Sequence, residues 1–370
     1  MESAAQRRRE IEQAARSCGF DRLGIADASP PAEARLFTDW LSKGFQGRMQ
    51  WLERGAAKRL DPSRVLPGVR SVVVGAVRYG PRAQPGGGPL SGRVSSYAWG
   101  DDYHLVVGER ASRLARFIRE RFSAQAVEYV DTGPVLERLW AARAGVGWIG
   151  KNAMVLNKDQ GSWIFLAVVL TDLVLPADPP SLDQCGACTL CIEACPTAAI
   201  VSPRTVDSRL CLSYLTIEHR GHFPAAHRED AGDRAFGCDD CQTVCPWNAG
   251  EPSKEQAFAP RDENGAPDLA DLAAMALPDY TRRFRRSSMK RATYHGLRRN
   301  AAVALGNLLA GGRGRIGQAG RGEWPPSAED RRRALEVLRR LTEDAEPSVA
   351  SAARAAMERS GLSASVDPEG

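Results

Sequence analysis

Eight of the nine cysteines in the 370-residue chain lie between Cys185 and Cys245. The first run, CGACTLCIEACP at 185–196, has the C-x2-C-x2-C-x3-C-P spacing of ferredoxins that bind cubane iron–sulfur clusters. The second run, CDDCQTVCP at 238–246, has one cysteine fewer, and Cys211 can supply the missing thiolate. Eight thiolates are sufficient for two four-iron clusters. The pattern therefore predicts a ferredoxin-like domain with two [4Fe-4S] clusters.

The fourth cysteine of such a run binds the other cluster in two-cluster ferredoxins. We therefore expect one cluster to be held by Cys185, Cys188, Cys191 and Cys245, and the other by Cys195, Cys211, Cys238 and Cys241. The alternative is structural zinc, which favours separated C-x2-C pairs. The ninth cysteine, Cys18, is expected to be a small buried hydrophobe.

The composition is that of a globular protein, with 43% hydrophobic and 26% charged residues. It excludes a chain that is mostly disordered, collagen-like or embedded in a membrane. The longest apolar run, Trp163 to Leu170, is far shorter than the roughly 20 residues of a membrane span. The N-terminus has basic residues but no apolar segment typical of a secretory signal. We therefore expect a soluble, cytoplasmic protein, in which clustered thiols are metal ligands rather than disulfides.

Hydrophobic patterning predicts three regions. Helices are predicted over 5–17, 36–43, 105–122 and 135–144, and strands over 22–26, 71–79, 126–130 and 162–170. This alternation indicates an α/β (α+β) catalytic domain over residues 1–180, followed by the ferredoxin-type domain over 181–252. Residues 253–370 are predicted to form a HEAT-like helical region with a Gly-rich loop at 311–322. Plain helical packing is the alternative for this last region.

Positive charge is concentrated in residues 281–300, which contain no acidic residue. The eight basic residues are Arg282, Arg283, Arg285, Arg286, Lys290, Arg291, Arg298 and Arg299. Such a stretch is the electrostatic footprint of a protein that binds a phosphate backbone. The interleaved Phe284 and Tyr294 could stack on exposed bases. The alternative is a solvated basic helix face.

Several stretches, taken with the cysteine runs, resemble the epoxyqueuosine reductase family, which is related to the reductive dehalogenases. They are GRVSSYAWGDDYH at 92–104, EYVDTGPVLERLWAARAGVGWIGKN at 128–152, GSWIFLAVVLTD at 161–172, CLSYLTIEHRG at 211–221 and RNAAVALGN at 299–307. The resemblance implies a tRNA-modifying oxidoreductase that carries cobalamin, resting as cob(II)alamin, and two [4Fe-4S] clusters. It further implies reduction of epoxyqueuosine to queuosine at the wobble position, the last step of queuosine biosynthesis.

By this resemblance Asp131, in the motif VDTGP, is the proton donor to the departing epoxide oxygen and also a cofactor contact. A free aspartic acid titrates near ~3.9, so this role requires an environment that raises the pKa of Asp131. The alternative is that Asp131 caps the N-terminus of the helix that follows it.

The resemblance also implies further contacts. Substrate contacts are expected from Tyr103, His104 and Arg138, and cobalamin contacts from Arg59, Tyr97, Lys151, Asn152 and Ser213. On the alternative interpretation, His104 is a core histidine, and Arg138 forms an ion pair with Glu137 or Glu128.

The implied partners are tRNA, bound through the anticodon stem-loop, and an external low-potential electron donor such as flavodoxin or ferredoxin. We expect no membrane partner and a monomer. One alternative is a reductive dehalogenase-like corrinoid enzyme that acts on a small halogenated substrate. A second alternative is an electron-carrier module of a larger complex.

Overall fold

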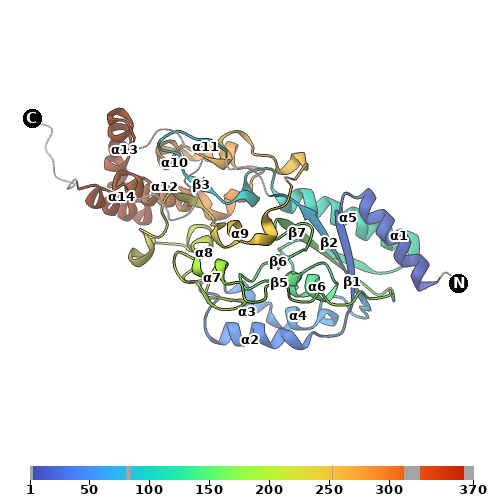
Figure 1. The fold of residues 1–370 in the computed structure, drawn as a ribbon. Coiled ribbons are helices and arrows are strands. Elements are labelled where there is room, and N and C mark those ends of the chain that lie inside the picture. Colours follow the sequence, from blue (N-terminus) through green and yellow to red (C-terminus); the bar gives the residue numbers. More distant parts are fainter. Residues whose placement is uncertain (1–2, 81–84, 252, 312–325, 362–370) are drawn as a thin grey trace, which may run out of the picture.

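The computed structural model describes residues 3–80, 85–251, 253–311 and 326–361 (Figure 1). The predicted Gly-rich loop at 311–322 lies outside these residues except for Gly311, as do residues 81–84 of the Gly/Pro-rich segment after the second predicted strand. Figure 1 shows a sheet with α1 and α5 at one end of the molecule and α12, α13 and α14 at the other, with α7, α8 and α9 between them. Among the described residues, no helix has both the length and the apolar composition to cross a bilayer.

The sheet has four antiparallel strands in the order β1-β2-β7-β4. These are β1 (Arg22–Asp27), β2 (Ser71–Arg78), β7 (Ile164–Thr171) and β4 (Ala126–Tyr129). The two central strands are in register from Ser71 opposite Thr171 to Arg78 opposite Ile164. Both are almost wholly buried, because helices cover both faces of the sheet.

Alternate residues of β2 and β7 pack into two different cores. On one face, Val73 and Val77 pack with α1 (Ala4–Ser17) and α5 (Tyr103–Phe122), and Cys18 is buried there as expected. On the other face, Val72 and Val74 pack with α6 (Glu137–Arg143), whose Trp140 is fully buried. The mixed α and β content of this region matches the prediction.

The remaining elements follow the chain. They are α2 (Arg35–Ser42), α3 (Trp51–Arg54), α4 (Ala56–Leu60), β3 (Arg93–Val94), β5 (Trp148–Ile149), β6 (Val155–Leu156), α7 (Leu190–Glu193), β8 (Ile200–Ser202), β9 (Thr205–Val206), α8 (Leu212–Ile217), β10 (Arg234–Phe236), α9 (Asp240–Thr243), α10 (Leu269–Ala274), α11 (Leu277–Arg283), α12 (Thr293–Leu309), α13 (Ala328–Leu341) and α14 (Pro347–Arg359).

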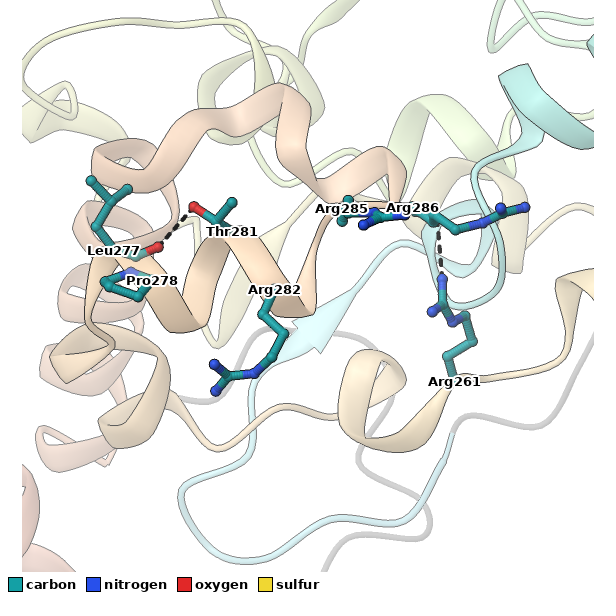
Figure 2. A pocket seen from close by; sticks show the side chains of 7 residues that line it. All are labelled: Arg261, Leu277, Pro278, Thr281, Arg282, Arg285 and Arg286. Atoms are coloured by element: carbon teal, nitrogen blue, oxygen red, sulfur yellow. Dashed lines mark hydrogen bonds between the residues drawn. The ribbon is translucent and has the colours of Figure 1, made fainter.

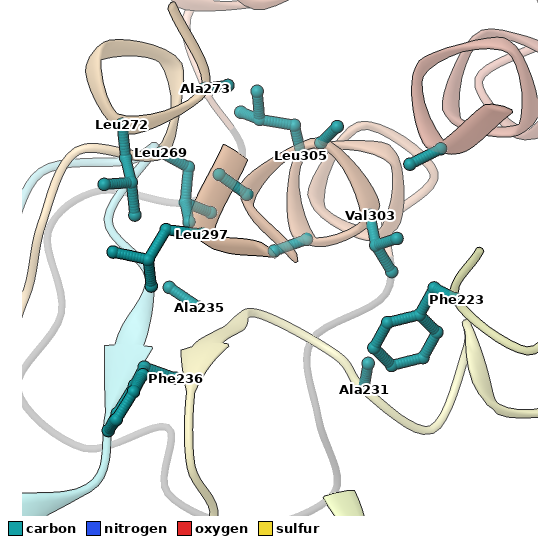
Figure 3. Close-up of a cluster of buried hydrophobic side chains, with 14 of the residues drawn as sticks. Phe223, Ala231, Ala235, Phe236, Leu269, Leu272, Ala273, Leu297, Val303 and Leu305 are labelled. Atoms are coloured by element: carbon teal, nitrogen blue, oxygen red, sulfur yellow. The ribbon is translucent and has the colours of Figure 1, made fainter. Parts of the chain in front are cut away.

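Helix α12 is surrounded by other elements along most of its length. It packs against α10 and α14, against α8 and against β10, so that Leu297 and Leu305 share one core with Phe223 and Phe236 (Figure 3). This core joins the cysteine-bearing segments to the C-terminal helices. The residues of α12 from Gly296 to Leu309 are all buried.

The expectation that Arg298 and Arg299 bind tRNA is wrong, because their side chains point into the protein. They are only 9% and 1% exposed. Arg298 forms an ion pair with Asp344 at 2.5 Å. The guanidinium of Arg299 donates hydrogen bonds to three backbone carbonyls of the segment after Cys211, those of Leu215 (2.9 Å), His219 (3.0 Å) and Gly221 (2.8 Å).

Replacing Arg299 with methionine should lower the free energy of unfolding by about 3 kcal/mol, because the buried carbonyls lose their partners. Arg285→Met, a change at an exposed arginine, should change it by less than about 0.5 kcal/mol. Unfolding experiments on the anaerobically purified proteins measure the change in the free energy of unfolding for both variants. Equal stability of the two variants would contradict the structural role given to Arg299.

Candidate functional site

The eight clustered cysteines form two groups of four whose thiols act on one another electrostatically. Cys191 has Cys185, Cys188 and Cys245 as its electrostatic neighbours, and Cys241 has Cys195, Cys211 and Cys238. Desolvation raises the pKa of the Cys191 and Cys241 thiols, and the neighbouring thiols raise it further. Each group has the members of one predicted ligand set, and four thiols is the number of donors that a cubane cluster requires. The assignment of these thiols as cluster ligands stays a prediction.

Two neighbouring side chains fix the cysteine runs to the sheet region. The ammonium of Lys151 donates to the carbonyls of Gly186 (2.7 Å) and Cys188 (2.9 Å). The amide of Asn152 donates to the carbonyl of Cys241 at 3.1 Å. These bonds use two of the three N–H groups of the Lys151 ammonium and one of the two N–H groups of the Asn152 amide. Both residues therefore hold the cysteine runs, and their expected cobalamin contacts stay a prediction.

A short segment connects the second cysteine group with the surroundings of Asp131. Asp239, between Cys238 and Cys241, accepts hydrogen bonds from the backbone N–H (2.7 Å) and hydroxyl (2.8 Å) of Ser96. The next residue, Tyr97, places its ring edge-on to Tyr103 at 6.0 Å. No residue in the described part of the chain forms a hydrogen bond with the Tyr97 hydroxyl, so this phenol can bind a ligand.

Asp131 lies in a cluster that contains the residues expected to contact substrate. Its Oδ2 accepts a hydrogen bond from the Tyr103 hydroxyl at 2.8 Å and lies 3.3 Å from Nε2 of His104. Its backbone N–H donates to Oε1 of Glu137 at 2.5 Å. Arg138 donates to the carbonyl of Ala153 at 2.6 Å, and its charge acts on Asp131. The sequence places these residues far apart, and the fold brings them together.

The backbone of Asp131 is in the left-handed region, with φ of 59°. Side-chain-bearing residues seldom adopt this conformation, although Asp and Asn do so more often than others. Helix α6 begins at Glu137 after Leu136 and has no side-chain cap. The alternative role of Asp131 as a helix cap is therefore not observed.

The charge state of the cluster differs from the expectation. Desolvation acts to raise the pKa of Asp131, but hydrogen bonds from His104 and Tyr103 and the charge of Arg138 lower it below its usual value. Desolvation acts to lower the pKa of His104, but its contacts with Asp102 and Asp131 raise it to about 9. At neutral pH, Asp131 is thus ionised and His104 carries the proton. The expected rise in the pKa of Asp131 is not found, because no sequence pattern reveals the imidazolium beside it.

Glu137 is a site residue that the sequence indicated only as a possible ion-pair partner of Arg138. Desolvation, together with the nearby charge of Asp131, raises the pKa of Glu137 to about 8. An acidic residue at the first position of a helix is ordinarily explained by its favourable interaction with the helix dipole. In the sequence, only its position six residues after Asp131 indicated that Glu137 could belong to the site.

The remaining cofactor candidates are Arg59, Tyr97 and Ser213. Arg59 is buried and donates to the carbonyl of Gly133 in the Asp131 loop at 3.3 Å. Ser213 is in α8, two residues after Cys211. With the free phenol of Tyr97, these residues supply hydrogen-bond donors that fit the amide and phosphate groups of a corrinoid.

The basic stretch around α11 contains an open pocket of about 820 Å3 (Figure 2). It is lined by Arg261, Leu277, Pro278, Thr281, Arg282, Arg285 and Arg286. Figure 2 shows the side chains of Arg282 and Arg286 reaching away from the ribbon in different directions. These two arginines and Arg285 are exposed, and their expected role in binding phosphates stays a prediction.

Arg282 is paired with Asp279, and the members of the stretch outside the pocket also have partners within the protein. Arg283 lies over the Phe284 ring, Lys290 pairs with Asp102, and Arg291 pairs with Glu218. Phe284 is buried, so the expectation that it stacks on bases is wrong. Burial of this ring in the core of α12 could not be deduced from charge spacing. The Tyr294 hydroxyl donates to the carbonyl of Met275 at 2.9 Å.

Comparison with known proteins gives two family matches within the chain. A model described as a 4Fe-4S double cluster binding domain matches residues 184–248, and one described as epoxyqueuosine reductase QueG, DUF1730, matches residues 59–132. The chain is 44% identical over 306 residues to the epoxyqueuosine reductase of Gloeobacter violaceus, covering 80% of this chain and 95% of the relative. It is 39% identical over 304 residues to that of Escherichia coli, covering 80% of each chain.

A solved structure has the same fold. The crystal structure of an epoxyqueuosine reductase with a tRNA-Tyr epoxyqueuosine-modified stem loop has a TM-score of 0.85 and 29% sequence identity. The match covers 97% of this chain and 91% of the other. Since the relatives are matched over most of their length, the chain belongs to the epoxyqueuosine reductase family of oxidoreductases.

Proposed function

We propose that this protein reduces epoxyqueuosine to queuosine at the wobble position of tRNA, using cobalamin and two [4Fe-4S] clusters. The observation that carries the proposal is the line of contacts from the second cysteine group through Asp239 and Tyr97 to Asp131. It joins the cysteines that would hold an electron-carrying cluster to a proton-transfer site within one chain. A relative of the same fold was crystallised with an epoxyqueuosine-modified stem loop, which supports the substrate.

Removal of an epoxide oxygen as water consumes two electrons and two protons. A bound corrinoid would supply a low-potential cobalt centre beside the substrate, and Arg59, Tyr97 and Ser213 would hold it. The chain's own task is to protonate the departing oxygen, since an unprotonated oxide is a poor leaving group. Asp131 is placed for this role by Tyr103 and His104.

The two cysteine groups differ in exposure, which suggests a direction for the electrons. Cys188 of the first group is exposed, whereas the Cys241 thiol of the second group is strongly desolvated. We infer that electrons enter at the first group from an external low-potential donor such as flavodoxin or ferredoxin, and leave from the second. A cytoplasmic monomer, region boundaries at 180/181 and 252/253, and a HEAT-like character of the C-terminal helices stay predictions.

The basic pocket favours RNA over the alternative substrates. A dehalogenase-like enzyme acting on a small molecule has no use for Arg282, Arg285 and Arg286 around an open pocket. An electron-carrier module has no use for the Asp131 cluster. We propose that stem phosphates bind these three arginines while the modified base enters the site, since loop bases can be splayed out.

Substitution of Cys211 with serine should remove one cluster and leave the other. Iron content should fall from about eight to about four atoms per chain. Cys18→Ala, a change at the cysteine outside both groups, should keep about eight. Retention of all the iron in the Cys211 variant would contradict its assignment as a ligand.

Asp131→Asn should reduce turnover by about 100-fold or more, because the group that protonates the leaving oxygen is lost. Asparagine tolerates the left-handed backbone, so iron content and RNA affinity should be preserved. Asp159→Asn, at an exposed carboxylate paired with Arg22, is the matched control. Near-normal turnover of the Asp131 variant would exclude the role.

Replacing Arg282, Arg285 and Arg286 together with glutamine should weaken RNA binding and flatten its salt dependence. Each lost phosphate contact should lower the log–log slope by roughly 0.7–0.9. The control replaces three exposed arginines of α1 and α5, which are Arg9, Arg16 and Arg116. The same slope in both triple variants would place the RNA elsewhere.

A further inference from the structure

The N-terminal end of α5 joins the Asp131 cluster to residues 282–291, here called the basic segment. Asp102, the N-cap of α5, is 1% exposed. Its Oδ1 accepts hydrogen bonds from the backbone N–H of His104 at 3.1 Å and from Nδ1 of the same residue at 2.7 Å. Its Oδ2 lies 2.9 Å from Nζ of Lys290. The Asp102 backbone N–H donates to the carbonyl of Arg286 at 2.9 Å.

The position of Lys290 is fixed by its neighbours in the chain. Ser287 caps the short 3-10 helix 288–292 by accepting from the backbone N–H of Met289 at 3.2 Å. Met289 and Ala292 are fully buried in the core around α12. The Lys290 side chain is 51% exposed, yet its ammonium reaches a buried carboxylate. The lysine is therefore held between the core and Asp102.

We propose that Lys290 is a positioning residue that, by holding Asp102, orients His104 so that its Nε2 presents a proton to Asp131. The inference rests on the proposed function and deepens it. Because Nδ1–H is directed at Asp102, the proton that can be transferred is on Nε2, which faces Asp131. The chain of contacts runs without a gap from the basic segment to the site of protonation.

The proton transfer balances with the overall reduction. Because Asp131 is ionised at rest, the Nε2–H bond of His104 breaks first and an Oδ2–H bond forms on Asp131. That O–H bond then breaks as the departing epoxide oxygen takes the proton, and the electron pair of the broken N–H bond stays on the imidazole, which becomes neutral. Solvent reprotonates half-exposed His104, which delivers the second proton by the same route, and the two electrons come from the external low-potential donor through the clusters.

Charged and titratable groups face His104 from two sides. On the side of α5 and the basic segment lie Asp102, Lys290 and Arg291, and on the side of the Asp131 loop and α6 lie Asp131, Arg138 and Glu137. The ring of Tyr103 stacks on the imidazole at 4.0 Å. Despite desolvation, hydrogen bonds to His104 and Lys290 lower the pKa of Asp102 to about 2.

The test compares Lys290→Met and Lys290→Arg with Arg285→Met, which removes one charge from the same segment. Single-turnover rates with excess holoenzyme are measured across pH on a stem loop carrying epoxyqueuosine, and RNA affinity is measured across salt. In Lys290→Met the rate should fall about tenfold through lost orientation. The alkaline limb of the pH–rate profile should move to higher pH by about 0.5–1 unit, because removing a positive charge favours protonated His104.

The variants should separate positioning from RNA binding. Lys290→Arg should restore the alkaline limb, and the salt slope should be unchanged in both Lys290 variants. Arg285→Met should lower the slope by roughly 0.7–0.9 and leave the pH profile unmoved. A Lys290→Met variant with a lowered slope and an unmoved profile would show an ordinary phosphate contact and overturn the proposal.

A second measurement does not depend on turnover. The His104 ring should titrate at higher pH in Lys290→Met than in the parent, as followed by NMR with His104→Gln to assign the signal. An unshifted midpoint would also overturn the proposal. A parent enzyme that fails to convert epoxyqueuosine, but whose His104 midpoint responds to Lys290, would instead count against the proposed function alone.

Discussion

Hydrogen-bond donors outside the three cysteine-bearing segments hold the backbones of those segments in place. Arg299 binds three carbonyls after Cys211, and Asn300 donates to the carbonyls of Thr216 (2.7 Å) and Ala235 (3.0 Å), which joins the Cys211 and Cys238 segments. Lys151 and Asn152 do the same from the sheet side. A region this small has little apolar core of its own. The cysteine groups therefore depend on both flanking regions for their geometry.

The Asp131 cluster is held together by charged side chains rather than by hydrogen bonds to backbone carbonyls. Lys290, Asp102, His104, Asp131 and Arg138 form a chain in which each charge has a neighbour of opposite sign. Asp102 is the buried member of this chain, and a buried charge is costly unless it is paired, so removal of Lys290 or His104 would leave it with one partner fewer. The raised pKa of His104 keeps a proton on the imidazole, and the lowered pKa of the neighbouring Asp131 leaves that carboxylate ionised. A proton therefore moves from His104 to Asp131 before it can reach a substrate.

Local patterns predicted the parts of the structure that depend on local interactions. The run SVVVGAVRY predicted a strand over 71–79, and β2 spans Ser71–Arg78. The cysteine spacing predicts two ligand sets of four, and the thiols that act on Cys191 and on Cys241 belong to one set each. Charge counting could not separate Arg285, which is exposed, from Arg299, which is buried, because only the packing around α12 distinguishes them. The charge state of Asp131 depends on His104, which is 27 residues away in the sequence.

The dependence of the Cys211 segment on Arg299 and Asn300 has a consequence for the order of events during synthesis. Ribosomes deliver a chain from its N-terminus, and the earlier parts begin to fold first. All eight clustered cysteines emerge before α12, but the donors that fix Leu215 and Thr216 arrive with that helix. The hydrogen bonds that hold the segment after Cys211 can therefore form only after Asn300 has been made, when slightly more than four-fifths of the chain has been synthesised.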